Sequence, residues 1–146
     1  MSNGGGESVT GKQHATVSTI TASVTVLASP ALTRLVGYDA VMGLIAGAIV
    51  GILVTPDIDH HVITYEENRI KRWCNLCGKI WIIYWLPYSK AFKHRGISHA
   101  PIVGTMTRAL YFPLPVIVAG WFGIASVVGL LAGWALQDLL HIAGDR

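Results

Sequence analysis

Charged residues are scarce in this chain of 146 residues: they make up 13% of it, whereas 52% of the residues are hydrophobic. An ordinary soluble domain has about 25% charged residues. So little charge argues against intrinsic disorder, and it leaves too few polar side chains to cover the surface of a free soluble globule. The mean hydropathy of +0.51 therefore predicts a membrane protein, and the length predicts a single domain.

Cysteine is also rare, because Cys74 and Cys77 are the only two. Two cysteines do not make a disulfide framework, and we expect both to be reduced thiols on a cytoplasmic face. Their spacing is that of a thioredoxin-type motif, but no βαβ pattern surrounds them, and no second pair completes a four-thiolate zinc site. We therefore predict neither role. We also expect no cleavable signal peptide, and we expect residues 1–13 to form a flexible tail.

Two apolar stretches in the first half are candidates for membrane spans, which need roughly 20 residues. Residues 15–33 carry no charge but are rich in serine and threonine, whose hydroxyls can bond back to their own helix. Residues 40–56 are more uniformly apolar. In this stretch glycines recur every four residues and form a smooth stripe where another helix can approach closely. The stripe consists of Gly43, Gly47 and Gly51.

The second half contains a longer apolar region, in which Arg108 is the only formal charge between residues 96 and 137. This region is too long for one helix across a bilayer of about 30 Å. We predict a hairpin with arms 101–119 and 124–141, and with a tight turn at residues 120–123. Pro113 and Pro115 would kink the first arm. A single long span over residues 109–137 is the alternative.

The charged residues lie mainly between these two regions. Residues 57–100 contain seven of the eleven basic residues, which predicts a cytoplasmic segment by the positive-inside rule. Aromatic side chains among the cations favour a helix in the lipid headgroup layer over an RNA-binding strip. We therefore predict an all-α polytopic membrane protein with about four transmembrane helices and an interfacial amphipathic segment between the second and third. The aromatics are Trp73, Trp81, Tyr84, Trp85 and Tyr88.

Histidines and aspartates gather on one predicted side of this membrane. With a cytoplasmic amino end, the second span brings the chain back to that side, the third leaves from it, and the fourth returns to it. Four distant parts of the sequence then meet in one plane, which scattered polar residues would not be expected to do. A single span over residues 109–137 would instead place Asp138 on the opposite side of the membrane from His99. The candidates are His14, Asp57, Asp59, His60, His94, Arg95, His99, Asp138 and His141.

The chemistry of these residues favours a divalent metal ion. Alternate residues of an extended chain point the same way, so Asp57 and Asp59 can face one cation. His94 and His99 flank Arg95, so two imidazoles can bind a metal beside a cation that attracts an anionic oxygen. Imidazole suits Zn²⁺ and other first-row metals, and carboxylate suits Mn²⁺ and Mg²⁺.

The last span adds a carboxylate and an imidazole. Asp138 and His141 share a helix face with Trp134, and Asp138 either ligates the metal or orients a ligating histidine. Arg108 is a functional candidate because a charge inside the membrane is costly. It either stabilises an anionic substrate or pairs with Asp138. Ser98 does not form a catalytic dyad with the neighbouring histidine by adjacency alone.

Over residues 11–141 the order of these motifs resembles that of a family of small membrane proteins, common in cyanobacteria, that are classed as metal-binding proteins of unknown function. That family is similar to the YdjM-like inner-membrane metal-dependent hydrolases, which also have a Pro-Asp-x-Asp and a His-Arg-x-x-(Ser/Thr)-His. The resemblance rests on Gly11-Lys12-x-His14, Pro56-Asp57-x-Asp59, Trp85-Leu86-Pro87-Tyr88, His94-Arg95-x-x-Ser98-His99, Gly104-Thr105-x-x-Arg108 and Asp138.

The resemblance implies a metal-binding domain over residues 14–146. This chain departs from the family pattern at Ala15, where an acidic residue is expected. The implied ligands are His14, Asp57, Asp59, His94, His99 and Asp138.

The leading hypothesis is a metal-dependent hydrolase of a phosphoester or lipid-linked substrate at the cytoplasmic interface, with one or two zinc or manganese ions. Arg95 and Arg108 would neutralise an anionic substrate, and His60, His141 or an aspartate would carry the proton. The alternative is a non-catalytic protein that senses, handles or is stabilised by metal. We expect membrane lipids and no nucleic acid as partners, in a bacterial inner membrane or a phage-encoded equivalent. A metal-free phosphatase is not predicted, because its arginine-rich motif order is missing.

Overall fold

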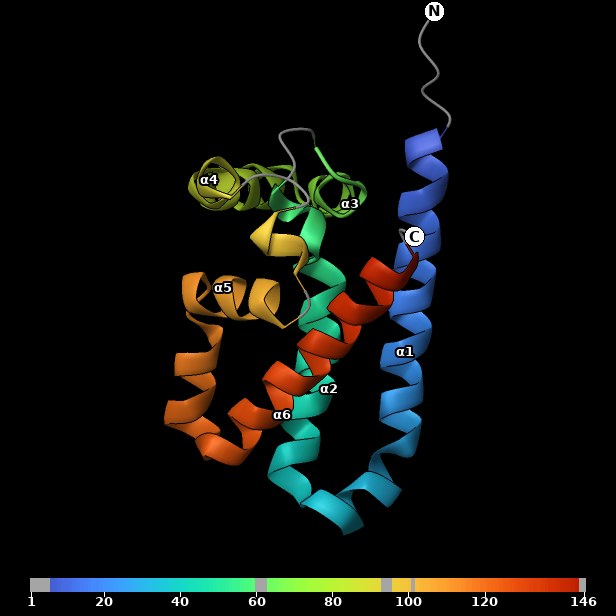
Figure 1. Cartoon of the computed structure of the whole chain (residues 1–146), viewed down its shortest axis with the longest axis vertical. Helices are drawn as coiled ribbons and strands as arrows, with labels where there is room; N and C mark the ends of the chain where they lie inside the picture. Colours follow the sequence, from blue (N-terminus) through green and yellow to red (C-terminus); the bar gives the residue numbers. More distant parts are fainter. Residues whose placement is uncertain (1–5, 60–62, 93–95, 101, 145–146) are drawn as a thin grey trace, which may run out of the picture.

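The computed structural model describes residues 6–59, 63–92, 96–100 and 102–144, with side chains from Gln13 onward except those of Asp59 and Ser98. Every regular element in these residues is a helix. The chain runs down α1 (Gly6–Val36), turns at Gly37 and returns through α2 (Tyr38–Leu53), as Figure 1 shows. Gly37 has a φ of 87°, a left-handed conformation that glycine adopts without steric cost. α1 begins inside the segment predicted to be a flexible tail.

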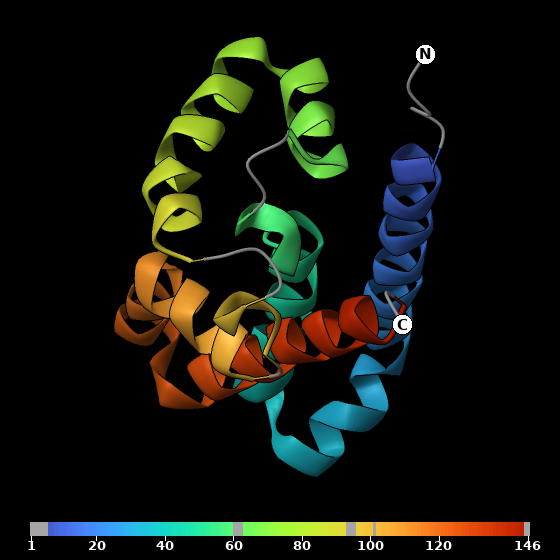
Figure 2. The same ribbon diagram turned by 45° about the horizontal axis from the view of Figure 1, so that its top comes forward.

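Shorter elements lie across the upper end of α2. A 3-10 turn, η1 (Pro56–Asp59), leads to α3 (Tyr65–Trp73) and α4 (Asn75–Ala91), which form a helical hairpin (Figure 2). A second 3-10 turn, η2 (Ile97–His99), precedes α5 (Val103–Tyr111) and then α6 (Leu114–Gly144). In Figure 1, α3, α4 and α5 lie across the direction of α1 and α2. α5 lies within residues 101–119, which were predicted to form a spanning arm, and it runs across α2 instead.

α2 and α6 cross in direct backbone contact. A Cβ atom on Gly43 or Gly47 would overlap the main chain of α6, and one on Gly129 or Gly133 would overlap the main chain of α2. Gly51 faces the side chain of Gln137 in the same seam. The predicted glycine stripe on α2 is therefore confirmed, and α6 contributes a matching stripe that the sequence analysis did not identify.

The predicted hairpin in the second half is correct at its turn and wrong in its first arm. α6 is broken at Gly123, whose φ of 79° lies outside the helical region, and the chain reverses there (Figure 1). The arm before the turn is not one helix. It is divided into α5 and the first part of α6, because Pro113 cannot continue the hydrogen bonding of α5. The break at Gly123 rules out a straight span over residues 109–137.

Two of the helices in the described residues are long and apolar enough to cross a membrane: residues Gln13–Val36 of α1, and α6. Only 11% and 17% of the residues in their most apolar windows are buried, whereas the core helix of a soluble protein is mostly buried. The hydroxyls of α1 bond back to the helix, as predicted; Thr19 and Thr25, for example, donate to the carbonyls of Ala15 and Thr21. α2 is apolar but shorter.

The hairpin of α3 and α4 is held by local and tertiary contacts. The Thr64 hydroxyl accepts from the Glu67 amide at 3.3 Å, and the Glu67 carboxylate accepts from the Thr64 amide at 2.9 Å, which caps the start of α3. On α4, Trp85 and Tyr88 are buried against the aromatic ring of Tyr111 on α5. The aromatics predicted to lie among headgroups therefore divide, and these two belong to the core.

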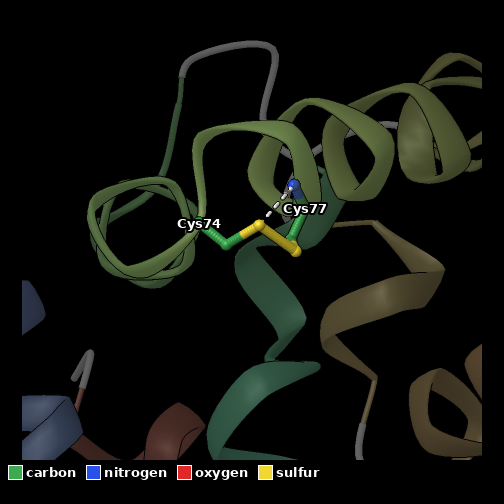
Figure 3. Close-up of a disulfide and its surroundings, with 2 residues drawn as sticks. All are labelled: Cys74 and Cys77. Carbon is green, nitrogen blue, oxygen red and sulfur yellow. Dashed lines mark hydrogen bonds between the residues drawn. A yellow bond between two sulfur atoms is a disulfide. The ribbon is translucent and has the colours of Figure 1, made fainter.

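The expectation of reduced thiols is wrong, because Cys74 and Cys77 form a disulfide at the corner between α3 and α4 (Figure 3). Their Cα atoms are 5.1 Å apart, within the usual range for bridged pairs. The reason is local. A Cys-x-x-Cys at a helix start places both sulfurs on one side of the first turn, so the pair needs no disulfide framework elsewhere in the chain.

Candidate functional site

The site is centred on Asp57, the second residue of η1 at the end of α2. Its two carboxylate oxygens face two imidazoles: His99 Nε2 lies 3.4 Å from Oδ1, and His141 Nε2 lies 3.2 Å from Oδ2. The three residues come from η1, η2 and α6, so the fold joins three parts of the chain that are far apart in sequence. The imidazoles are largely buried, whereas the Asp57 side chain is 34% exposed, which leaves the cluster open to small ions.

His14 extends the cluster from a fourth element. Its ring stacks on the ring of His141, with centroids 4.1 Å apart. Gly144 makes room for this contact, because a Cβ there would lie 2.9 Å from the His14 ring. The predicted convergence of α1, the end of α2, the η2 segment and the end of α6 is therefore present in the fold.

The electrostatics of the cluster favour a charged carboxylate. Burial alone would raise the pKa of Asp57, but hydrogen bonds and charge from His141 and His99 outweigh that effect and hold the pKa well below its ordinary value. Asp57 is therefore an anion at neutral pH and available as an oxygen ligand. Its position between two imidazole nitrogens suits a divalent cation that prefers mixed nitrogen and oxygen donors.

Glu66 on α3 is a member of this region that the sequence analysis missed. The residue is 7% exposed, and its Oε2 atom has no hydrogen-bond partner among the described residues. Burial raises the pKa of Glu66, and the charges of Arg69 and His141 oppose that rise, which places the carboxyl near the cluster. Its neighbour Glu67 is equally buried but is used by the Thr64 cap. This segment was predicted to be interfacial, and nothing in its sequence distinguishes Glu66 from the neighbouring charged residues.

A second polar group lies in the helix bundle next to the cluster. Asp138, one turn before His141 on α6, accepts from the Arg108 guanidinium and from the Thr105 hydroxyl, both on α5. Arg108 and Asp138 are each almost completely buried. Of the two roles foreseen for Arg108, the ion pair is the one present, and its guanidinium is shielded from any substrate in solution.

Two side chains of α6 make three further hydrogen bonds that fix this helix beneath the cluster. The indole nitrogen of Trp134 donates to the Val54 carbonyl at 3.0 Å, just before η1. The amide nitrogen of Gln137 donates to the carbonyls of Ser18 on α1 and Ala48 on α2, at 3.0 and 3.2 Å. Side chains of α6 therefore tie this helix to α1, to α2 and to the residue that follows α2, and this holds the backbones that carry Asp57 and His141.

The remaining predicted residues cannot be placed. His60, His94 and Arg95 lie outside the described residues, and so does the side chain of Asp59. Within the part of the chain that is described, no group of three or more histidine, cysteine, aspartate and glutamate side chains has an arrangement that would hold a metal ion. Asp59, His60, His94 and Arg95 are neighbours in sequence of the η1 and η2 segments that carry Asp57 and His99.

Comparison with known proteins agrees with this donor chemistry. A search found no match among curated proteins or solved structures. The family model described as "Uncharacterized metal-binding protein (DUF2227)" matches residues 9–144, which includes every element from α1 to α6 except the start of α1. The chain therefore belongs to this family of uncharacterised metal-binding proteins.

Proposed function

We propose that this protein is a metal-binding membrane protein that holds a divalent ion, zinc or manganese, at the cluster centred on Asp57. The observation that supports this most strongly is the Asp57 carboxylate lying between the Nε2 atoms of His99 and His141. Imidazole and carboxylate together are typical ligands of zinc. His14, Asp59, His94 and Asp138 remain proposed ligands or orienting groups from the sequence. We propose one or two ions for the complete set.

The proposed setting is the cytoplasmic face of a membrane. α1 and the part of α6 after the break at Gly123 would span, α2 would cross beside them, and the hairpin of α3 and α4 would lie in the headgroup layer. In support, the exposed face of α4 and the corner before it carry apolar side chains next to basic residues. Membrane lipids are the proposed partners. The apolar side chains are Trp73, Leu76, Ile80 and Ile83.

Replacing Asp57 by alanine is expected to remove the metal. Protein purified in detergent and loaded with Zn²⁺ or Mn²⁺ should carry stoichiometric metal by elemental analysis, and Asp57→Ala should carry only traces, since both imidazoles lose their shared carboxylate. Asp39→Ala is the matched control, because this exposed aspartate lies in the first turn of α2 at the opposite end of the helix. Equal trace metal in the wild-type protein and both variants would contradict the proposal.

Metal-dependent hydrolysis of a phosphoester or lipid-linked substrate is the second candidate, and Glu66 is the observation that favours it. A divalent ion bound here would activate water and polarise the scissile bond. The buried carboxylate of Glu66, which is 7% exposed, can then accept a proton. His60, His141 and Arg95 are proposed to take part in proton transfer and anion binding. Non-catalytic metal handling needs none of these steps.

The Glu66→Gln variant separates catalysis from metal binding. If the protein hydrolyses phosphoesters or phospholipids, this variant should lose about 10²–10⁴-fold in turnover. Glu67→Gln is the matched control, because glutamine at that position preserves the cap of α3. Turnover would be measured with Mn²⁺ or Zn²⁺ added. No turnover by metal-loaded wild-type protein, or equal turnover by both variants, would favour non-catalytic binding.

A further inference from the structure

The disulfide of Cys74 and Cys77 lies where a second protein can reach it. Cys77 is exposed, and Cys74 is half-buried at the N-cap of α4 (Figure 3). Cys77 is therefore the more exposed residue of the two, and it is the one that an incoming thiol would attack.

The local structure also stabilises negative charge on one of the two sulfurs. The Cys77 amide donates a hydrogen bond to Cys74 Sγ at 3.2 Å. The first turn of a helix favours an anion there, and nearby cations favour a thiolate in the same way. Three exposed cations lie within a few residues of the pair. They are Lys71, Arg72 and Lys79.

The bond contributes little to holding the corner between α3 and α4. A disulfide that closes so short a loop removes less entropy from the unfolded chain than one that closes a long loop. The corner is also held without it. The Cys74 amide donates to the Ile70 carbonyl at 3.0 Å, and Gly78 packs against the backbone of Lys71 so closely that a Cβ would overlap it. Breaking the bond therefore leaves the hairpin in place.

We propose that Cys74 and Cys77 form a redox-active pair that exchanges with a dithiol reductant. A thiolate of the reductant attacks Cys77 Sγ, the bond between the two protein sulfurs breaks, and Cys74 leaves as the stabilised thiolate. The second thiol of the reductant then attacks the mixed disulfide and releases Cys77. The reductant loses two electrons and becomes a disulfide, and the protein gains two electrons and, with protons, becomes the dithiol.

Equilibration with dithiothreitol tests the exchange on the intact protein. Wild-type protein in detergent, without denaturant, would be incubated with graded ratios of reduced to oxidised dithiothreitol. Free thiols would then be trapped with a mass-tagged maleimide and counted by mass spectrometry. We expect both thiols to appear in one reversible two-electron transition with unchanged helicity. A bond that resists excess reductant, or a pair that never oxidises in these mixtures, would overturn the proposal.

Single-cysteine variants test which sulfur leaves. Cys77→Ser retains only Cys74, and Cys74→Ser retains only Cys77. We expect the Cys74 thiol to react with iodoacetamide at neutral pH at least about tenfold faster per accessible thiol, because iodoacetamide reacts with the thiolate. Rates would be normalised to each variant at a pH where both thiols are ionised. Equal normalised rates would overturn the assigned roles.

Discussion

Replacing Gly47 by leucine is expected to prevent α2 and α6 from packing. A Cβ at this position already overlaps the Leu130 carbonyl, so the main chain of one helix has to move before a longer side chain fits. Overpacking a well-filled core typically costs about 1–3 kcal/mol, and we expect the upper end or more here, because backbone atoms cannot change rotamer. Unfolding in mixed micelles, followed by tryptophan fluorescence, measures the loss.

Gly120→Leu is the matched control for this prediction. Gly120 lies in the same kind of apolar helix, but a Cβ there meets no atom within 4 Å. The control should change the free energy of unfolding by less than about 0.5 kcal/mol. If both substitutions have the same small effect, α2 and α6 do not make the close contact described above.

Arg108→Met is expected to be the most damaging single change of a charged residue. It leaves the Asp138 carboxylate buried next to Thr105 without its cation. Breaking one side of a buried ion pair costs about 3–5 kcal/mol, whereas replacing both sides by apolar residues is often close to neutral. The double variant Arg108→Met/Asp138→Leu should therefore be more stable than the single variant.

A double-mutant cycle on unfolding free energies measures this coupling. The four proteins are the wild type, Arg108→Met, Asp138→Leu and the double variant. Additive effects would mean that the two residues do not interact in the folded protein.

The metal content of the same four proteins separates two roles of Asp138. If Asp138 only positions α6, the double variant keeps its metal. If Asp138 is a metal ligand, the double variant folds but loses its metal.

The sequence predicted that four distant parts of the chain meet, and His14, Asp57, His99 and His141 do lie together. The part of that prediction which the fold confirms is the turn at residues 120–123, which reverses the last region, whereas the first arm of the hairpin is not one helix. The spacing of small residues likewise predicted the close contact of α2. These features follow from chain direction and helical period, which do not depend on side-chain detail.

Other features could not be predicted, because they depend on how particular side chains and helices pack, and the hydrophobic periodicity of the sequence does not report that packing. Glu66 lies in a segment rich in charge, and its burial arises only from the way α3 folds over the cluster. The sequence left open whether Arg108 contacts a substrate or pairs with Asp138. The position of α5 against α6 decides for the ion pair. α5 is a separate helix because Pro113 follows it, and a proline alone does not distinguish a kink from a break.

The contact at Gly43 and Gly47 acts as a pivot for the residues at the helix end. Asp57 lies ten residues beyond Gly47, so the helical rise places it on the order of 15 Å from the pivot. A change in crossing angle of about 5° would move it by about 1 Å, whereas ligand distances in metal sites vary by only about 0.2 Å. Bilayer thickness influences helix tilt. In the proposed membrane setting, lipid composition would therefore tune the affinity for the ion that we propose is held between Asp57 and His141.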